Sequence, residues 1–347
     1  PPQQLLVFHL DSDNKWVEHS KYDLLDADVS SRRKSLLARQ TKSGVLEVFV
    51  NCDEGIQKIV LQPGARAEWL TPREEQSRKK WWLADLDGDG HDDLVEQTSD
   101  SDAPVRWYRG SGDGRLAPAA TLYDRSVSDA QVFRSSEHVE LALLDGSVRQ
   151  LLRRYRVEQG DSNEFGLQRP LALDDASKTA WCGMRQGENK VLVVADRNRP
   201  QLLWYELDES GWWEEKSYPA VSGIERLVAP AAKAGTVLIW AKDASDLMVS
   251  EWKADRLTYP LPDVRSGDSE DRKILALDAV GSTTWWVQKV GKHLDLYRWP
   301  PEASEAEVLR FEGVGSKTNE VLWIGGDRLL VKDTHSRALK LVSSEEG

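Results

Sequence analysis

The residues of this 347-residue chain whose types and spacing could do chemistry are concentrated in one stretch, WWLADLDGDGHDDLVE at 81–96. Five aspartates lie there within nine residues: Asp85, Asp87, Asp89, Asp92 and Asp93. Glycines at positions 88 and 90 permit the backbone angles that wrap a chain around a point. The alternating carboxylates can then turn inward, and calcium takes six to eight oxygen ligands at about 2.3–2.6 Å. The spacing predicts one calcium site; an acidic turn without an ion is the alternative, disfavoured because like charges repel.

The same residues also satisfy the written pattern of an EF-hand, from Asp85 to Glu96 in the twelfth place. The eighth place of such a loop is normally apolar, and here it is Asp92. An EF-hand needs a helix on each side, whereas residues 81–84 are too few and QTSDSDAP at 97–104 cannot be helical. The EF-hand interpretation is therefore disfavoured.

The loop resembles the calcium loop of the FG-GAP/VCBS repeat family, written D-x-D-G-D-G-x-x-D-L, which reads DLDGDGHDDL at 85–94. The match continues in VRWYRGSGDG at 105–114, so the resemblance covers about one repeat, residues 81–123. The resemblance implies five ligands, four side chains and one main-chain carbonyl: Asp85, Asp87, Asp89, Asp93 and the carbonyl of His91. It implies one structural calcium as the cofactor. No catalytic residue is predicted, because nothing in 81–96 suggests a second functional group.

Short strands joined by tight turns are expected to position this loop. Runs of β-branched and aromatic residues alternate with polar residues, as at 46–50, 105–108, 191–194 and 237–240. Such alternation is typical of strands, and helical patterning is almost missing. The sequence therefore predicts an all-β protein.

The strands recur with a period of 47 or 49 residues. One apolar signature, a hydrophobic run, a small or polar turn and a second run, begins near Leu36, Leu83, Val132, Trp181, Val228, Leu275 and Leu322. Four short antiparallel strands of this total length fit a β-propeller blade. Because one such sheet cannot cover both of its faces, blades stack around an axis. We expect a single propeller domain over residues 1–347.

The two ends of the chain are expected to build the last blade together. Residues 5–22 contain two strands, and the segment after Leu322 is too short for a whole blade. Residues 5–10 and 339–342 both resemble a third strand, for which only one place is available. We predict a seven-bladed propeller closed by its N- and C-terminal strands, which leaves no exposed sheet edge. Eight blades is the alternative.

Composition narrows the classes of partner. The net charge of −12 and the scattering of the basic residues argue against nucleic acid, whose phosphates need clustered Lys and Arg. No apolar run approaches the roughly 18 residues of a transmembrane segment. Cys52 and Cys182 are predicted to be free thiols that are not bonded to each other. No signal peptide is present at the abrupt start Pro1-Pro2; a mature or trimmed protein would look like this, so the absence does not argue for the cytoplasm.

Fifteen tryptophans are a further candidate for function. The adjacent pairs at 81–82, 212–213 and 285–286 are expected on strands covered on both faces, where neighbouring side chains wedge between blades. Trp212 or Trp213 could instead offer a sugar-stacking platform, because two glutamates follow in a predicted outer strand. Trp299, followed by two prolines, is the other candidate for an exposed binding residue.

Together with the resemblance, these features predict a non-catalytic interaction module that is secreted, periplasmic or on the cell surface and binds a protein or carbohydrate. Two alternatives stay open: a sugar- or polysaccharide-acting propeller enzyme of lyase or dehydratase type, and a lectin-like propeller. An enzyme should bring ionisable side chains together at one mouth of the central channel. A lectin should expose Trp side chains, and an interaction module should expose an apolar patch.

Overall fold

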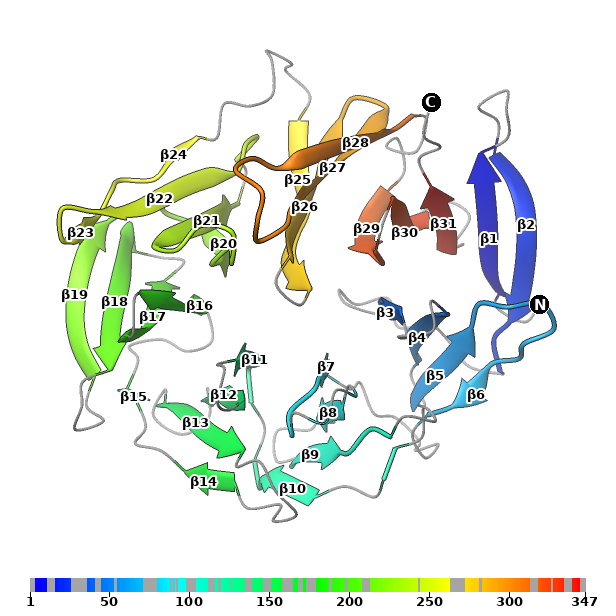
Figure 1. Cartoon of the computed structure of the whole chain (residues 1–347), viewed down its shortest axis with the longest axis horizontal. Coiled ribbons are helices and arrows are strands. Elements are labelled where there is room, and N and C mark those ends of the chain that lie inside the picture. Colours follow the sequence, from blue (N-terminus) through cyan, green and yellow to red (C-terminus); the bar gives the residue numbers. More distant parts are fainter. Residues whose placement is uncertain are drawn as a thin grey trace.

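The structure is a computed structural model. It describes residues 4–10, 16–25, 36–40, 45–52, 55–70, 80–87, 89, 91, 93–97, 104–111, 116–117, 120–125, 127–134, 139–145, 151–157, 165–167, 171–172, 179–186, 189–196, 199–207, 213–242, 244–262, 272–280, 283–312, 318–325, 327–333 and 339–343. Among these residues the regular secondary structure is all β-strand, with no helix. Small sheets of neighbouring antiparallel strands surround a common centre, which is the arrangement of a β-propeller (Figure 1). The all-β prediction is confirmed for this part of the chain.

Each sheet begins at a strand near the centre of the ring and continues outward (Figure 1). One sheet contains β3 (Leu36–Gln40), β4 (Leu46–Cys52), β5 (Gly55–Val60) and β6 (Glu68–Trp69). The next contains β7 (Lys80–Ala84), β8 (Asp93–Gln97), β9 (Val105–Tyr108) and β10 (Ala120–Tyr123). It is followed by β11 (Asp129–Arg134), β12 (Val139–Asp145), β13 (Leu151–Val157) and β14 (Phe165–Leu167), with β15 (Leu171–Ala172) also paired to β13.

The second half of the chain continues the same pattern. A sheet of β16 (Thr179–Gln186), β17 (Asn189–Asp196), β18 (Gln201–Leu207) and β19 (Trp213–Pro219) comes first. It is followed by β20 (Ile224–Val228), β21 (Thr236–Ala241), β22 (Met248–Lys253) and β23 (Arg256–Leu257), with β24 (Leu261–Pro262) also paired to β22. The sheet after it contains β25 (Arg272–Val280), β26 (Thr283–Val290), β27 (His293–Trp299) and β28 (Glu307–Phe311).

The residues at which the repeats are predicted to begin all lie in the first strand of a sheet: Leu36, Leu83, Val132, Trp181, Val228, Leu275 and Leu322. Short turns explain the compact repeat. For example, β26 and β27 are joined through Gly291, whose φ of 58° lies in the left-handed region that favours glycine. The hydrophobic period therefore coincides with the order of the sheets.

The two ends of the chain meet in one five-stranded sheet of order β2-β1-β31-β30-β29. It consists of β29 (Thr318–Trp323), β30 (Arg328–Asp333), β31 (Leu339–Ser343), β1 (Gln4–Leu10) and β2 (Trp16–Asp23). β1 pairs with β31 in parallel, whereas the other pairs are antiparallel. The expectation that segments 5–10 and 339–342 compete for one place is therefore wrong, because the two segments pair side by side. Two parallel strands that follow one another in a chain need a long crossover between them. β1 and β31 are the first and last strands, so no direct connection has to join them.

The core lies between neighbouring sheets, and paired tryptophans fill it. Trp285 packs with Val321 and Leu329 of the sheet on one side, whereas Trp286 packs with Leu238 and Leu247 of the sheet on the other side. Both rings are buried. Adjacent residues of a strand point to opposite faces of a sheet, and this pair confirms the predicted wedge between sheets.

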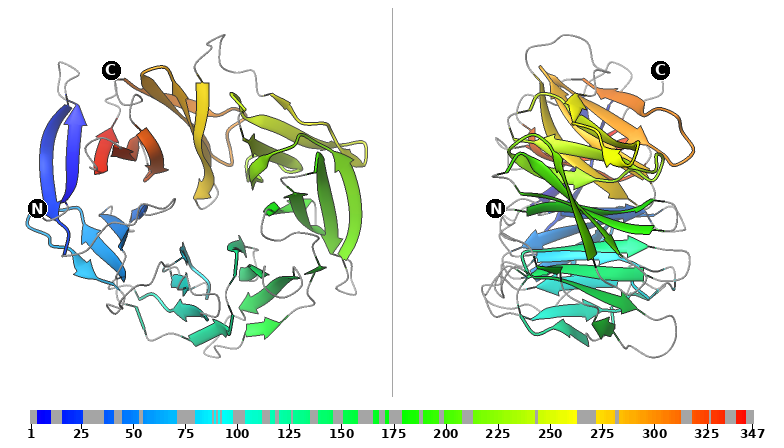
Figure 2. Two further views of the ribbon diagram at one scale, coloured as in Figure 1. Left: turned by 180° about the vertical axis from the view of Figure 1, so that it is seen from behind. Right: turned by 90° about the vertical axis from the view of Figure 1, so that its left-hand side faces the viewer.

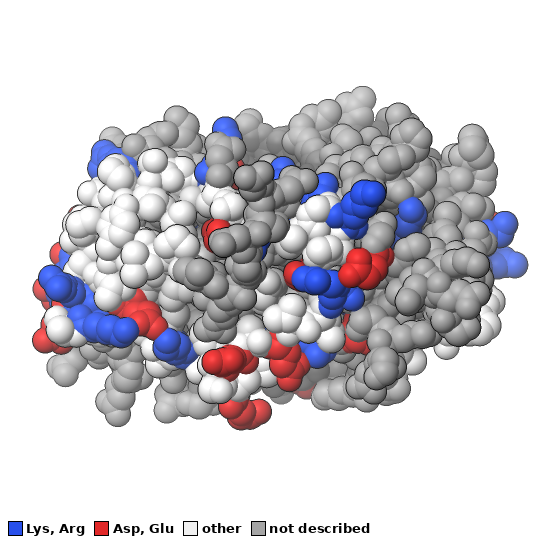
Figure 3. Space-filling model, turned by 90° about the horizontal axis from the view of Figure 1, so that it is seen from above, with Lys and Arg blue, Asp and Glu red and all other residues white. Residues whose placement is uncertain are grey.

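Seen from the side, the ring is a disc whose sheets stand face to face (Figure 2). On the described part of the rim seen from above, Lys and Arg side chains are interspersed with Asp and Glu (Figure 3). The outer strands carry ion pairs; Arg298, for example, donates to Glu307 at 2.8 Å. In the described residues no helix is long and apolar enough to cross a membrane.

Both cysteines are buried free thiols, as predicted. Cys52 ends β4, and Cys182 lies on β16 in another sheet. A disulfide needs Cα atoms about 4.4–6.8 Å apart, and the sheets of β7–β10 and β11–β15 lie between those of Cys52 and Cys182 (Figure 1).

Candidate functional site

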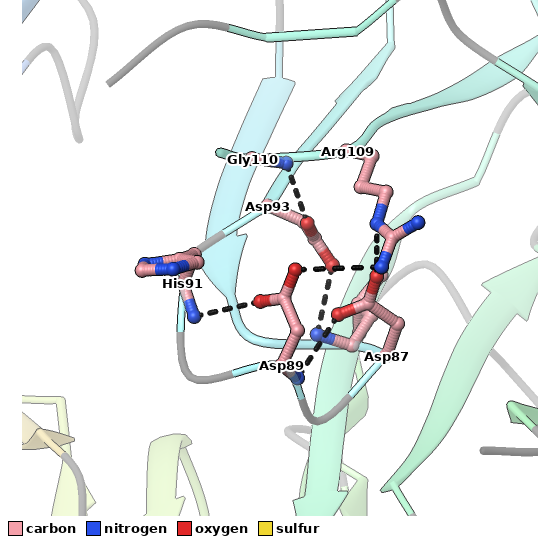
Figure 4. A network of polar contacts seen from close by, with 7 residues as sticks. Asp87, Asp89, His91, Asp93, Arg109 and Gly110 are labelled. Atoms are coloured by element: carbon pink, nitrogen blue, oxygen red, sulfur yellow. Dashed lines mark hydrogen bonds and ion pairs between the residues drawn. The ribbon is translucent and has the colours of Figure 1, made fainter. Parts of the chain in front are cut away.

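The acidic loop joins the two innermost strands of one sheet, β7 and β8. Asp93 begins β8, and Leu86, earlier in the loop, is fully buried in the core together with side chains of β8 and β9. This apolar anchor holds the loop against the sheet. Figure 4 shows Asp87, Asp89 and Asp93 gathered beside Arg109, which follows β9.

Asp93 fastens the loop to the neighbouring strand. Its Oδ2 accepts a hydrogen bond from the backbone N–H of Leu86 at 2.9 Å, and its Oδ1 accepts one from Gly110 at 2.7 Å (Figure 4). Burial raises the pKa of Asp93 to about 6, against the lowering effect of these two bonds; the charge of Asp87 adds to the rise. The resemblance implies that Asp93 is a calcium ligand, but its carboxylate lies outside the group formed by those of Asp85, Asp87 and Asp89.

Asp85, Asp87 and Asp89 come together, as their alternating spacing predicts. One carboxylate oxygen of each lies within 4.8 Å of the others. Oδ1 of Asp87 accepts a hydrogen bond from the N–H of Asp89 at 3.2 Å, and Oδ1 of Asp89 accepts one from the N–H of His91 at 2.8 Å. These bonds curl the chain so that the carboxylates face one another. The carbonyl of His91 stays a predicted ligand, and Asp92 lies outside the described residues.

Arg109 faces this acidic group from the end of β9. Its Nε lies 2.6 Å from Oδ2 of Asp87, and its Nη2 lies 3.5 Å from Oδ2 of Asp89. Oδ2 of Asp87 is buried, and its partner among the described residues is the guanidinium of Arg109. The loop brings three carboxylates together, and calcium is bound by carboxylate oxygens. The residues present therefore fit a calcium ion.

A second set of polar side chains lies on the innermost strands β11, β16, β20 and β25, which neighbour one another around the centre of the ring (Figure 1). Nη2 of Arg226 on β20 donates to Oδ1 of Asp278 on β25 at 2.8 Å. Nε1 of Trp181 on β16 donates to Oδ2 of Asp129 on β11 at 3.1 Å. We call Asp129, Trp181, Arg226 and Asp278 the inner-strand group.

Arg226 connects the two pairs of the inner-strand group. The charge of Asp278 raises the pKa of Arg226, burial opposes the rise, and the charge of Asp129 adds to it. The guanidinium is therefore kept charged between two carboxylates. The Arg226 side chain is 25% exposed and that of Asp278 is 42% exposed, so solvent reaches the ion pair. Nε of Arg226 is buried and has no hydrogen-bond partner among the described residues.

Cys182 lies close enough to Arg226 for the guanidinium charge to affect its pKa, but the thiol is not suited to act as a nucleophile. Burial raises the pKa of Cys182 to about 12, and Arg226 lowers it only in part. The thiolate is the reactive form of cysteine, so this side chain stays protonated at neutral pH. Within the inner-strand group the ionisable groups are therefore the guanidinium and the two carboxylates.

The predicted tryptophan platforms are placed differently. Trp299 is 3% exposed, and its Nε1 donates to the carbonyl of Ala303 at 2.9 Å. The prediction that it is exposed is wrong, because the turn after Pro300 brings Ala303 back to the indole, whose ring lies in the core. Trp212 and the side chain of Trp213 lie outside the described residues, so their role in binding stays a prediction.

Comparison with known proteins supports the architecture. No family model and no curated protein sequence matches this chain. A solved structure from Bacteroides uniformis, provisionally named a 6-phosphogluconolactonase, has a TM-score of 0.53 at 11% identity, covering 90% of this chain and 93% of the other. One from Bacteroides fragilis with the same provisional name has a TM-score of 0.50 at 11% identity, covering 91% and 93%. At this identity the likeness establishes the fold.

The names of these two structures correct the predicted function. Both are named as enzymes, whereas the sequence analysis predicts a non-catalytic interaction module. The physical reason for the error is that the sequence resemblance covers one calcium loop, and a loop between two strands carries no information about side chains at the centre of the ring.

Sequence reasoning missed Arg109 and the inner-strand group. Arg109 lies within the matched repeat, directly after Tyr108, and a basic residue beside an acidic loop is a usable signal. Asp129, Arg226 and Asp278 are charged residues in the innermost strands β11, β20 and β25. Charge in such a covered strand is unusual and could have identified them.

Proposed function

We propose that this chain is a sugar-acting enzyme whose reaction centre is the inner-strand group. The observation that carries the proposal is the partly exposed ion pair between Arg226 and Asp278, on different sheets, with Asp129 acting on the same guanidinium. Ionisable side chains that converge from distant parts of a sequence are typical of active sites. The described structure favours this centre over the acidic loop, which is fitted to hold an ion.

The first substrate class to test is the lactone of a sugar acid. The provisional names of the two similar structures suggest it, since both specify a phosphogluconolactone. Hydrolysis of a lactone needs a base for the attacking water and a donor for the carbonyl oxygen. A carboxylate beside a guanidinium offers both groups.

The test is the ring opening of glucono-δ-lactone, with and without a 6-phosphate, followed in a pH-stat against the spontaneous reaction. Aryl glycosides and uronate-containing polysaccharides form the second part of the panel, because they represent the other sugar-acting chemistries. We expect saturable acceleration with at least one lactone. If no compound of the panel reacts faster than in buffer, the proposal is wrong.

We also propose that the acidic loop binds one calcium ion through Asp85, Asp87, Asp89 and the carbonyl of His91, in a repeat of FG-GAP/VCBS type. The ion would supply positive charge and fasten the turn between β7 and β8. The convergence of three carboxylates supports this proposal. An exported location, which the resemblance implies, belongs to the same proposal.

Titration calorimetry of chelator-stripped protein with calcium tests the loop. We expect a stoichiometry near one, lost in Asp87→Ala and nearly kept in Asp92→Ala, since Asp92 is not among the proposed ligands. Equal loss in both variants, or a second site, would contradict the ligand set.

The finer architecture that we propose is a single domain with seven blades. It is supported by the coincidence of the predicted repeat starts with the first strands of the sheets and by the pairing of β1 with β31. Each sheet then corresponds to one blade, and the chain ends share the last one.

A further inference from the structure

Arg226 has hydrogen-bond donors that its contacts in the described structure do not use. A guanidinium has five N–H donors, and Arg226 makes one hydrogen bond, from Nη2 to Oδ1 of Asp278 at 2.8 Å. Nε is buried without a hydrogen bond, whereas Nη1 also has none among the described residues but is not buried. An oxygen atom of a ligand can therefore reach Nη1.

Asp129 offers the complementary group, an acceptor that solvent reaches. Its Oδ2 accepts a hydrogen bond from Nε1 of Trp181 at 3.1 Å, which fixes one side of the carboxylate. Its Oδ1 accepts no hydrogen bond from the part of the chain that the structure describes, and this oxygen is not buried. Because an ionised carboxylate can only accept hydrogen bonds, Oδ1 is available to a donor on a ligand.

Asp129 and Arg226 lie near each other without pairing. β16 neighbours both β11, which carries Asp129, and β20, which carries Arg226. The charge of Asp129 raises the pKa of Arg226, so the two groups are close enough to interact. Among the described residues, however, Arg226 forms its ion pair with Asp278, and more than 4.0 Å separates its nitrogen atoms from the Asp129 oxygens. Two hydrogen bonds of about 2.8 Å that run to neighbouring ligand atoms can bridge such a separation.

Asp278 holds the guanidinium in this place. Its Oδ1 accepts a hydrogen bond from the N–H of Ala279 at 3.0 Å in addition to the one from Nη2 of Arg226. The backbone of β25 therefore orients the Asp278 carboxylate, and this carboxylate orients Arg226 in turn. The position of the guanidinium is set by β25 as well as by β20.

We propose that Arg226 and Asp129 together bind two neighbouring hydroxyl groups of a neutral sugar. One hydroxyl group accepts a hydrogen bond from Nη1 of Arg226, and the next one donates a hydrogen bond to Oδ1 of Asp129. This inference rests on the proposed function and names what its reaction centre recognises. It concerns binding alone, so it can be tested without turnover.

A pair of hydroxyl groups suits this site better than a charged group does. A guanidinium only donates and a carboxylate only accepts, whereas a hydroxyl group does both. Hydrogen bonds to an ionised partner are also stronger than those between neutral groups. A ligand carboxylate or phosphate would be attracted by Arg226 but repelled by Asp129, and an ammonium group would meet the opposite conflict. A neutral diol satisfies both side chains.

Calorimetric titration of the wild-type protein tests this recognition. The first probes are the methyl glycosides of glucose, galactose and mannose, followed by the 2-, 3- and 4-deoxy analogues and the uronate of the one that binds tightest. We expect the 3-deoxy analogue and one of the other two to bind roughly tenfold less tightly, because each loses one hydrogen bond to a charged group. The uronate should bind less tightly than the neutral glycoside.

Two variants address the two contacts, Asp129→Asn and Arg226→Lys. Each should weaken binding of the glycoside roughly tenfold, since the first removes the negative charge and the second removes the planar set of donors. Each should also become less sensitive to removal of one of the two hydroxyl groups and stay sensitive to removal of the other, as in a double-mutant cycle. A general loss of structure would not produce this selectivity.

The matched controls are Asp255→Asn, in the exposed turn between β22 and β23, and Arg310→Lys, in an Arg–Asp pair on the outer strand β28. Both should bind the glycoside as wild type does, and the melting temperature of every variant identifies misfolding. Where one inner-strand variant does not fold, the other variant and the deoxy analogues on wild type decide the question.

The outcomes separate this inference from the proposed function. If wild type binds none of the three glycosides, if every deoxy analogue binds as tightly as its parent, or if both folded variants bind as wild type does, the inference is overturned; ring opening of lactones would still support the proposed function. If the analogues and variants behave as expected but no compound is turned over, the binding site stands and the proposed function fails. If wild type neither binds a glycoside nor accelerates a reaction, both are overturned.

Discussion

At the scale of single residues, burial divides the loop aspartates into two roles. Asp93 is fully buried, and each of its carboxylate oxygens accepts a hydrogen bond from a backbone N–H group, which connects the turn to the end of β9. Asp85, Asp87 and Asp89 keep their carboxylates together, and Arg109 is the cation that compensates them in the described structure. Two unlike cations, a guanidinium and a metal ion, would therefore compete for the same oxygens.

Replacement of Arg109 by glutamine should strengthen calcium binding. The substitution removes the competing charge while keeping a polar side chain of similar length. Arg109 is 48% exposed, so screening limits the effect, and we expect the Kd to fall roughly tenfold, which corresponds to about 1.4 kcal/mol. Calorimetric titration of chelator-stripped protein measures it.

Arg310→Gln is the matched control for this substitution, because it removes an equally charged side chain from an ion pair on another sheet. Its calcium affinity should equal that of wild type. An unchanged or weaker affinity in Arg109→Gln would show that the guanidinium does not compete with the ion.

Thiol reactivity should report the burial of the cysteines. Cys52 and Cys182 are both buried, and burial raises the pKa of Cys182 to about 12. We expect neither thiol to react with a disulfide reagent at pH 8 in the folded protein, and two thiols per chain to react in denaturant. Rapid labelling of the native protein, or fewer than two thiols after unfolding, would be inconsistent with the structure.

At the scale of elements, the strands are joined by turns whose backbone angles suit some residues better than others. The turn between β22 and β23 has Ala254 at φ 48° and Asp255 at φ 59°. Two-residue hairpin turns with positive φ at both positions favour Asn and Gly. An alanine there carries a steric cost of roughly 1–2 kcal/mol.

Replacement of Ala254 by asparagine should stabilise the protein. Asn tolerates the left-handed conformation better than Ala, so we expect the free energy of unfolding to rise by about 0.5–1 kcal/mol, measured by equilibrium denaturation in urea. The control is Ala231→Asn at an exposed turn position without positive φ, which should change stability by less than about 0.5 kcal/mol. A loss of stability in Ala254→Asn would contradict the argument.

Buried glutamines connect neighbouring sheets through the backbone of the linking segments. Gln57 on β5 donates to the carbonyl of Leu25 at 3.0 Å and accepts from its N–H at 2.9 Å. Gln97 on β8 accepts from the N–H of Val127 at 3.1 Å, and Gln288 on β26 donates to the carbonyl of Ser245 at 2.9 Å. These bonds satisfy backbone groups of segments that lie outside the strands.

At the scale of the whole molecule, the terminal strands complete a shared core. Leu5, Val7 and Tyr22 of β1 and β2 pack in one cluster with Val48 and Val50 of β4 in the next sheet. The parallel pairing of β1 with β31 connects this cluster to the C-terminal strands. Contacts between the N-terminal strands and the C-terminal strand β31 therefore contribute directly to the stability of the ring.

Deletion of residues 1–24 should destabilise the protein strongly. It removes β1 and β2, exposes the edge of β31 and uncovers apolar side chains of β4, at a cost of about 25 cal/mol per Å² of apolar surface. We expect a large fall in the melting temperature or aggregation through the open edge, measured by calorimetry and light scattering. Removal of residues 344–347, beyond β31, is the control. A monomeric deletion variant with an unchanged melting temperature would show that the ring closes without these strands.

The sequence by itself determined the strands, their period and the acidic loop, because these depend on short-range patterns. Alternation of apolar and polar residues reflects the two faces of a strand, and the period from Leu36 to Leu322 reflects a repeated unit. The spacing of Asp85, Asp87 and Asp89 brings carboxylates together within one turn, so no distant contact is needed to predict their convergence.

Only the tertiary structure decided which residues meet across sheets. Arg226 and Asp278 are 52 positions apart, as are Asp129 and Trp181, and their contacts depend on how neighbouring sheets are placed around the ring. The burial of Trp299 depends likewise on a turn that folds back on it. The partners of a side chain at the centre of a ring are set by the position of every sheet, and that position results from packing over the whole chain.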